Sequence, residues 1–269
     1  MDDRFLQGRH FLKSNWQLVK ETQSDQSRGL PPPLQELPPE SDDSVAVLPP
    51  VEAVYTAGAD KAAGGEAASD AAAPSGKAAP TLHSLLKNRK SRRSFKIEPL
   101  SLAELSYLLW SCEGVRENKG KYSFRTTPSG GARHPLDLYV FARRVGELKP
   151  GLYRYLPLEH SLVLERDGDD SKALDEALMG QLRNSSCVLL WAAVPYRSEW
   201  RYGKAADKLV ALDAGHSCQN LYLACEALGL GTCAVGAYDQ QRLDEYLGLD
   251  GEDMFALYAA PVGRPSENE

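Results

Sequence analysis

The sequence lacks the features of a membrane protein, of a secreted protein and of a metal site. Its 269 residues contain no apolar run of about 18 residues, so no membrane span is predicted. The first residues, MDDRFLQGRHFLKSNW, are too polar for a signal peptide. The five cysteines include no CxxC pair or zinc-like spacing, and Cys218 and Cys225 are too far apart on one predicted helix to form a disulfide. We therefore expect reduced thiols, no bound metal and a cytoplasmic location.

The chain also has fewer basic than acidic residues. Lys and Arg number 31 against 37 Asp and Glu, which gives a net charge of −6. This balance argues against nucleic acid or an anionic membrane surface as the main partner, although local basic clusters are compatible with it. The length allows one large or two small domains with a sizeable core.

Composition divides the chain into three parts. Residues 1–55 carry scattered aromatic residues and then proline clusters, which predicts an extended segment that covers the surface of something else. Residues 56–80 contain eleven alanines and four glycines without a hydrophobic period, which predicts a flexible linker. A compact domain is expected from Thr81 to the end, over 81–269.

The stretch 199–231 predicts the helix around which this domain is organised. From about Asp213 the helix is apolar on almost every side, so it is either buried in a large core or shared with a second subunit. Gly229 and Gly231 form a strong helix stop. Gly215, inside the helix, costs about 1 kcal/mol relative to alanine. It indicates either close approach of a backbone or flat ligand, or a glycine without a role.

The remaining elements mix helices and strands without a regular βαβ alternation, which predicts an α+β fold. Thr81 is expected to cap a helix that ends near Arg89, and Ser101 with Glu104 forms a capping box for a helix over 102–111. Further helices are expected over 171–179 and after Asp239. Strands are expected over 136–142, 151–155, 162–165, 186–194, 232–236 and 255–262.

Three stretches are candidates for binding chemistry. RKSRRSF at 89–95 places four cations and a hydroxyl within five residues, a pattern suited to a phosphate, although a solvated basic surface explains it too. RTTPSGGARHP at 125–135 exposes backbone amides near Gly130, or is an ordinary glycine turn. GLGTCAVGAY at 229–238 lets the chain pass close to a ligand at Gly236, or is a plain helix end followed by a strand. His134 is expected to be structural or exposed.

Together these stretches resemble a known family. RKSRRSF at 89–95, PLSLAELSYLLWSCEGV at 99–115, RTTPSGGARHPLDLYVF at 125–141, DAGHSCQNLYLACEALGLGTCAVGAYD at 213–239 and VGRP at 262–265 occur in the order of the FMN-dependent nitroreductase superfamily. The similarity is greatest to its SagB/ThcOx-like dehydrogenase branch. It covers Thr81 to Pro265, and the segment from Gly8 to Pro33 also resembles the N-terminal extension of some members.

The resemblance implies an α+β homodimer. Its central, mainly antiparallel sheet would be flanked by helices, a long helix would form the dimer interface, and two FMN molecules would lie between the subunits. Arg89, Lys90 and Ser91 would hold the phosphate and ribityl chain, and Arg93 would lie near the pyrimidine edge of the flavin. The other implied FMN contacts are Arg264 at the phosphate, Pro128, Ser129, Gly130 and Ala132 from the second subunit, and the amides of Gly236 and Ala237 beside flavin N5.

The activity implied is hydride transfer from NAD(P)H through flavin N5 to a small acceptor such as a nitroaromatic, quinone or enone, by a ping-pong mechanism. The acceptor pocket is expected to involve 113–123 and 197–202. Azoline-oxidising relatives have a Lys-Tyr pair before the interface helix, where this chain has Arg201 and Tyr202. Arginine is a poor base, so Tyr202 is the one candidate catalytic residue.

Two alternatives to this activity stay open. One is a SagB/ThcOx-type dehydrogenase that oxidises an azoline or a similar substrate and is reoxidised by oxygen or a carrier. The other is a non-catalytic flavin-binding protein whose N-terminal segment serves a partner.

Overall fold

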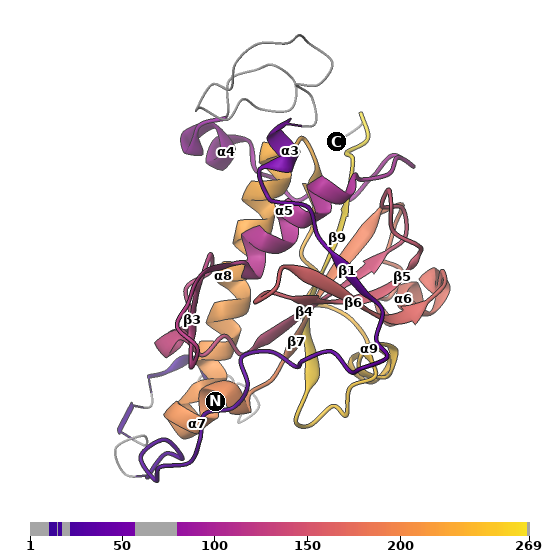
Figure 1. The fold of residues 1–269 in the computed structure, drawn as a ribbon. Helices are drawn as coiled ribbons and strands as arrows, with labels where there is room; N and C mark the ends of the chain where they lie inside the picture. The colour runs from indigo at the N-terminus through magenta and orange to yellow at the C-terminus, as the bar shows by residue number, and fades with distance from the viewer. Residues whose placement is uncertain (1–10, 15, 18–21, 57–79, 268–269) are drawn as a thin grey trace, which may run out of the picture.

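The computed structural model describes residues 11–14, 16–17, 22–56 and 80–267. Its centre is a seven-stranded sheet in which every neighbouring pair is antiparallel (Figure 1). The strands lie in the order β1 (Val45–Val47), β6 (Ser161–Asp167), β5 (Gly151–Leu156), β4 (Leu136–Ala142), β7 (Cys187–Ala193), β9 (Phe255–Gly263) and β8 (Gly231–Thr232). The linker predicted over 56–80 lies outside the described residues, apart from its first and last positions.

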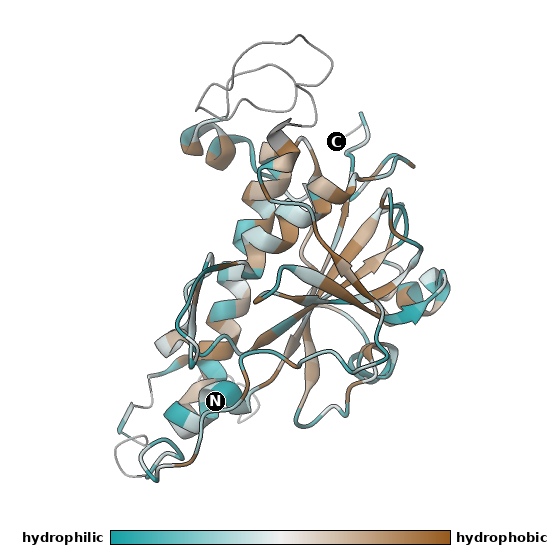
Figure 2. Cartoon of the chain, in the orientation of Figure 1, coloured by the Kyte–Doolittle hydropathy of each residue, from teal (hydrophilic) through white to brown (hydrophobic). Residues whose placement is uncertain are grey.

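Alternation along the two central strands gives the sheet two apolar faces. In β7, Leu189 and Trp191 point to one face, while Val188 and Leu190 point to the other. The first face is covered by α5 (Leu102–Glu113) and α8 (Ala206–Ala227), and the second by α6 (Ser171–Ala177) and α9 (Gln240–Leu247). Figure 2 shows the apolar colouring concentrated in these strands and on the inner sides of the helices. The predicted α+β class with a mainly antiparallel central sheet is confirmed.

The stretch 199–231 contains two helices rather than one. α7 (Tyr196–Tyr202) ends at Gly203, whose φ of 49° lies in the left-handed region that glycine tolerates, and a 3₁₀ turn over Gly203–Ala205 leads into α8. α8 ends as expected, with Gly229 at a φ of 66°.

One side of α8 is buried and the other is exposed. Val210, Ala214, Leu221 and Cys225 face the sheet and α5. Opposite them runs an exposed stripe made of Ala211, Leu212, Gly215, His216 and Gln219. The helix is therefore not surrounded within one chain, although the sequence predicts an almost wholly apolar circumference.

The N-terminal segment runs across the surface of the same domain. Near its start Gln26 N donates to Trp200 O, and Trp200 Nε1 donates to Leu30 O. Further on it reaches β1, which joins the sheet beside β6, and then the short helix α3 (Ala53–Thr56). The sequence predicts a compact domain from Thr81, whereas one strand of the sheet comes from before the linker. Three residues of β1 give too little pattern to predict a strand.

Two smaller features complete the fold. α4 (Leu82–Asn88) precedes the basic stretch, and Thr81 caps it by accepting from Ser84 N. β2 (Val115–Asn118) and β3 (Ser123–Arg125) form a hairpin that is separate from the main sheet. Among the described residues, none of the helices combines the length and apolarity that crossing a membrane requires.

Candidate functional site

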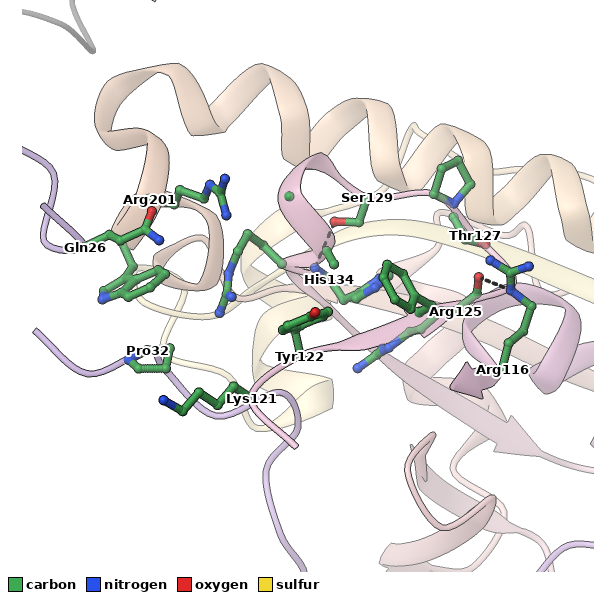
Figure 3. Close-up of a pocket in the computed structure, with 16 residues that line it drawn as sticks. Gln26, Pro32, Arg116, Lys121, Tyr122, Arg125, Thr127, Ser129, His134 and Arg201 are labelled. Atoms are coloured by element: carbon green, nitrogen blue, oxygen red, sulfur yellow. Dashed lines mark hydrogen bonds between the residues drawn. The ribbon is translucent and has the colours of Figure 1, made fainter. Parts of the chain in front are cut away.

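A cavity of about 840 Å³ lies between the β2–β3 hairpin, the turn over 127–134, α7 and the N-terminal segment. Figure 3 shows Gln26 and Arg201 at one end of the cavity and Arg116, Arg125 and Thr127 at the other, with Tyr122 between them. Both segments that the sequence predicts for an acceptor pocket, 113–123 and 197–202, contribute residues to its lining.

The turn over 127–134 is held firmly in place. Asn220 Nδ2 on α8 donates to Thr127 Oγ1 at 3.2 Å, and His134 N donates to Ser129 Oγ at 2.9 Å. Gly131 has a φ of 60°, and a Cβ there would lie 2.4 Å from the hydroxyl of Tyr202, so only glycine fits. Of the residues predicted to contact FMN, Pro128, Ser129 and Ala132 line the cavity, whereas Gly130 lies against Leu209 of α8.

Asp213 on α8 accepts hydrogen bonds from this turn. Burial raises the pKa of Asp213 to about 6, against the opposing effect of hydrogen bonds from the Ser129 side chain and the Gly130 backbone. Its Oδ2 is buried and has no hydrogen-bond partner among the described residues. The turn is thus attached to the first half of α8 through a carboxyl group that is costly to ionise.

A buried ion pair connects the hairpin to α5. Arg125 Nη1 lies 3.3 Å from Glu113 Oε2, and both side chains are almost completely buried. Arg125 Nη2 also donates to Gln35 O at 3.1 Å, which ties the N-terminal segment to the hairpin. Burial raises the pKa of Glu113 to about 7, although Arg125 and Ser217 lower it.

His134 is a structural residue in this arrangement. Burial, followed by the charge of Arg125, lowers the pKa of His134 to about 3, so the ring is neutral at physiological pH. A neutral ring donates from Nε2 to Ser123 O at 3.0 Å. The side chain lines the cavity but carries no charge into it. Tyr202, the candidate catalytic residue, lies against Gly130 and Gly131 and is not among the residues that line the cavity.

A second cluster of predicted site residues lies beside the second half of α8. The Arg89 guanidinium is 5.2 Å from the centre of the Tyr222 ring, and Ser91 Oγ is 3.0 Å from the Tyr222 hydroxyl. The same hydroxyl accepts from Ala234 N at 2.8 Å. Tyr222 therefore joins the basic stretch to the segment after β8.

The backbone also fastens the basic stretch to β8. Arg92 N donates to Thr232 O at 2.9 Å, and the Arg92 guanidinium pairs with Glu226 at 3.6 Å. Arg92 Nε is buried and has no hydrogen-bond partner among the described residues. A Cβ on Gly231 would lie 2.8 Å from Arg92 Cβ, so glycine is required for this close approach. Lys90 and Arg93 lie on the exposed side of the stretch.

Arg264 is close to this cluster in the fold but already has acidic partners. Its backbone O accepts from Lys96 N at 2.9 Å. Its guanidinium lies 3.0 Å from Glu104 and 3.6 Å from Glu98. The phosphate role predicted for Arg264 thus competes with two carboxylates, one of which also caps α5.

Gly236 and Ala237 are exposed just after Val235, which bridges to Ala259 of β9. Ala237 O accepts from Gln181 Nε2 at 2.7 Å. The amides of Gly236 and Ala237 have no acceptor among the described residues. Two N–H groups are therefore available to a ligand at this position.

The two clusters lie on opposite faces of α8. Asp213 under the turn and Tyr222 beside the basic stretch are nine residues apart on one continuous helix. At about 3.6 residues per turn this spacing is about two and a half turns, which points the two side chains in opposite directions and offsets them by about 14 Å along the axis. One chain therefore does not bring all of the predicted FMN contacts together.

Several residues of these clusters were not predicted from the sequence. Arg116, Lys121 and Arg133 line the cavity, Tyr222 and Arg92 belong to the basic cluster, and Asp213 holds the turn. Arg92 lies inside the basic motif, Arg116 and Lys121 lie in the segment predicted for the acceptor pocket, and Arg133 lies in the stretch 125–135, so the sequence carried a signal for these four. The roles of Tyr222 and Asp213 become visible only when distant segments are brought together.

Comparisons with known proteins give a consistent result. The sequence model of the nitroreductase family matches residues 86–264. A protein of Methanocaldococcus jannaschii that carries the name nitroreductase is 36% identical over 188 residues, or 69% of this chain and 92% of that protein. The trifolitoxin-processing protein TfxB of Rhizobium leguminosarum bv. trifolii is 30% identical over 152 residues, or 54% of this chain. This chain spans 41% of TfxB, less than half of its length.

Among solved structures, a nitroreductase from Ralstonia eutropha superposes with a TM-score of 0.62 at 28% identity. The superposition covers 88% of this chain and 100% of that one.

The raised pKa of Glu113 predicts how stability depends on pH. Because the folded pKa of about 7 exceeds the unfolded value of 4.5, the stabilisation is complete below pH 4.5 and is lost as the pH rises through 7. Glu113→Gln mimics the protonated carboxyl, so between pH 5 and 8 the variant should lose less free energy of unfolding than the wild type, by at most about 3 kcal/mol. Urea unfolding followed by circular dichroism at both pH values measures this difference.

Glu117→Gln, which is exposed on the same hairpin, is the control and should behave as the wild type. An identical pH dependence in all three proteins would contradict the raised pKa of Glu113.

Proposed function

Because the chain belongs to the nitroreductase family, we propose that it is an FMN-dependent oxidoreductase that uses NAD(P)H to reduce a small organic acceptor such as a nitroaromatic, quinone or enone. The acceptor would occupy the cavity beside the turn over 127–134. Its volume of about 840 Å³ lies within the range of about 300–1,000 Å³ that is usual for small-molecule sites.

The observation that carries the proposal is the position of the two clusters on opposite faces of α8. A second copy related by two-fold symmetry would place the turn of one subunit opposite the basic cluster of the other. The exposed stripe of α8 supports this arrangement. Gly215 lies seven residues before Tyr222, and Gln219 lies seven residues before Glu226, so the stripe continues on the same side of the helix as the two residues that meet the basic stretch. Among the described residues, nothing lies within 4 Å of a Cβ placed on Gly215. Two such helices can therefore approach closely, and we propose a homodimer with its cofactor sites at the interface.

The residues of the basic cluster fit the phosphate of FMN. Arg89 and Lys90 have no carboxylate partner among the described residues, and Arg92 Nε is a buried donor without an acceptor. Arg89, Lys90 and Ser91 would hold the phosphate and ribityl chain through charge-assisted hydrogen bonds. Arg264 would contribute less, because Glu104 and Glu98 already compensate its charge.

The ring of the cofactor would contact both subunits. The free amides of Gly236 and Ala237 would donate to it, and Arg93 would place a positive charge near its pyrimidine edge, where negative charge is stabilised. Pro128, Ser129, Gly130 and Ala132 of the second subunit would close the other side. When bound, FMN supplies the two-electron redox chemistry, while the protein binds and orients it. We also propose, as expected from the sequence, that the protein is located in the cytoplasm.

A second candidate function is the oxidation of an azoline or a similar substrate, and the similarity to the trifolitoxin-processing protein TfxB favours a role of this kind. Arg201 argues against it, because a permanently charged guanidinium is a poor base where the azoline-oxidising relatives have lysine. Tyr202 does not itself line the cavity, although its hydroxyl lies against Gly131, which does. Reduction of the bound flavin by a nicotinamide separates the two functions.

The proposed function is tested by the visible absorbance spectrum of the purified protein. We expect an oxidised-flavin band that bleaches on anaerobic addition of NADH or NADPH and returns with a nitroaromatic or a quinone. A flavin band that neither nicotinamide bleaches would favour the second candidate. A protein that contains no flavin and takes up no added FMN would refute the cofactor assignment.

The phosphate assignment predicts a loss of FMN affinity in the double variant Arg89→Ala/Lys90→Ala. Losing two charge-assisted contacts of about 1.5 kcal/mol or more each should raise the Kd for FMN by about 100-fold. Quenching of flavin fluorescence during titration measures the Kd. Lys87→Ala removes an exposed cation at the end of α4 and serves as the matched control. Unchanged affinity in the double variant would place the phosphate elsewhere.

The dimer proposal predicts that Gly215→Arg yields a folded monomer. A Cβ at this position meets nothing in one chain, and arginine has a higher helix propensity than glycine, so the fold should survive. The long side chain should separate the two copies of α8 and abolish FMN binding. Light scattering after size-exclusion chromatography gives the mass, and circular dichroism reports the fold. Gly215→Ala should remain a dimer, whereas a dimeric Gly215→Arg would contradict an interface at this stripe.

A further inference from the structure

The cavity is lined by several cations and, among the described residues, by no carboxylate. Its described lining residues include five basic side chains, Arg116, Lys121, Arg125, Arg133 and Arg201, and no aspartate or glutamate. This contrasts with the chain as a whole, whose net charge is −6. The concentration of positive charge therefore belongs to the cavity and does not follow from the composition of the protein.

Only one of these cations is paired with an acid. Arg125 forms the buried ion pair with Glu113. Arg116 donates from Nε to Arg125 O at 2.9 Å, but it has no carboxylate partner among the described residues. The same is true of Lys121, at the hairpin turn, and of Arg201, at the end of α7. Within the described part of the chain, four positive charges thus line the cavity without a carboxylate partner.

Arg133 is the most informative of the four. Its side chain is 6% exposed, yet in the described part of the chain it meets no carboxylate. Nε donates to Arg197 O at 3.0 Å, and the guanidinium lies 4.9 Å from the centre of the Trp200 ring. Burial, followed by the charges of Arg201 and Arg197, lowers the pKa of Arg133. The two terminal nitrogens donate to no described group, so the guanidinium of this mostly buried residue presents two unused donors to the cavity.

Such an arrangement costs free energy unless an anion occupies the cavity. Unpaired charges in partly buried positions are unfavourable, and neighbouring like charges increase the cost. A planar guanidinium is matched geometrically by a carboxylate or a phosphate, which accepts two parallel hydrogen bonds. The guanidinium of Arg133, which lies over the Trp200 ring, is well placed to bind such an anion.

Aromatic side chains make up much of the remaining wall. Trp200, Tyr122 and Phe124 line the cavity. The rings of Tyr122 and Phe124 pack edge to face, with their centres 5.6 Å apart. Gln26 and Pro32 of the N-terminal segment close one side, which limits the size of the ligand. Flat apolar walls beside a cationic end suit a small aromatic ring that carries an anionic group.

We propose that the acceptor reduced by this protein is a small aromatic anion, whose carboxylate or phosphate binds Arg133, Lys121 and Arg201 and whose ring lies among Trp200, Tyr122 and Phe124. This inference rests on the proposed function, because it names the substrate class of the same site. It adds that the negative charge of an acceptor, as well as the ease with which the acceptor is reduced, decides whether the protein uses it.

The first test compares two ligands of the same shape and different charge. Benzoate and benzamide are titrated into FMN-loaded protein, and binding is followed by calorimetry. We expect benzoate to bind at least about ten-fold more tightly than benzamide, and the advantage to shrink as salt screens the charges. Phenyl phosphate in place of benzoate shows whether the site prefers a phosphate. Equal affinity for benzoate, phenyl phosphate and benzamide would refute the proposal.

The second test removes single cations. Lys121→Gln and Arg201→Gln should each reduce the preference for benzoate about three- to five-fold, as expected for exposed ion pairs. Arg133→Gln should reduce it about ten-fold or more, because its residue is mostly buried and its guanidinium can give a carboxylate two charge-assisted hydrogen bonds. Lys119→Gln is the matched control: Lys119 lies on the same hairpin, pairs with Glu117 and does not line the cavity. A thermal melt of Arg133→Gln checks its fold, while the two exposed variants keep the test decisive if that variant unfolds.

Turnover then shows whether the cations serve the acceptor or the electron donor. With 4-nitrobenzoate and 4-nitrobenzamide as acceptors, the wild type should show a higher kcat/KM for the anion, and this ratio should fall in Lys121→Gln. If the variants instead lower kcat/KM for NADPH and leave the acceptor ratio unchanged, the proposal is wrong. Failure of the proposed function has a different signature, since the protein would then take up no FMN or its flavin would not be reduced by NAD(P)H, whichever aromatic ligand is present.

Discussion

A helix that lies on a sheet can bury only part of its circumference against that sheet, and α8 shows the consequences of this limit. Val210, Ala214, Leu221 and Cys225 cover one face of the central strands, which leaves the stripe around Gly215 exposed in the described part of the chain. The same geometry separates the turn on Asp213 from the basic cluster on Tyr222. The core, the exposed stripe and the divided site thus all follow from the way α8 packs on the sheet, and they are the reason for proposing a site shared between two copies of the chain.

The charged side chains around the cavity also fall into two groups, those paired within the chain and those without a described acidic partner. The domain neutralises one buried guanidinium, Arg125, with Glu113, and uses this pair to join the hairpin, α5 and the N-terminal segment. Arg133 receives only a carbonyl and an aromatic face. Structural charges are therefore compensated within the chain, whereas the charges at the cavity are left to a ligand. His134 contributes no charge despite its position, because burial and Arg125 keep it neutral.

The sequence predicted well those features of the fold that depend on local motifs. The α+β class followed from the irregular order of helices and strands, and the antiparallel sheet and the family followed from five ordered motifs. The helices α4, α5 and α9 have the caps that Thr81, Ser101 and Asp239 predict. It was uninformative where contacts join distant segments. The pairing of Arg264 with Glu104 spans 160 residues, and the break at Gly203 interrupts an otherwise helical pattern. The cations of the cavity come from a hairpin, a turn and α7, so no spacing along the chain reveals them.

The N-terminal segment gives the cavity one wall while belonging to none of the family motifs in the domain. Backbone contacts from Gln26, Leu30 and Gln35 hold it against Trp200 and Arg125. None of the residues proposed to hold the cofactor lies in this segment, so the two groups occupy different parts of the chain. Natural selection could therefore reshape the choice of substrate by altering a peripheral strap, while the redox machinery stays intact. New specificity would then evolve without a period of lost catalysis.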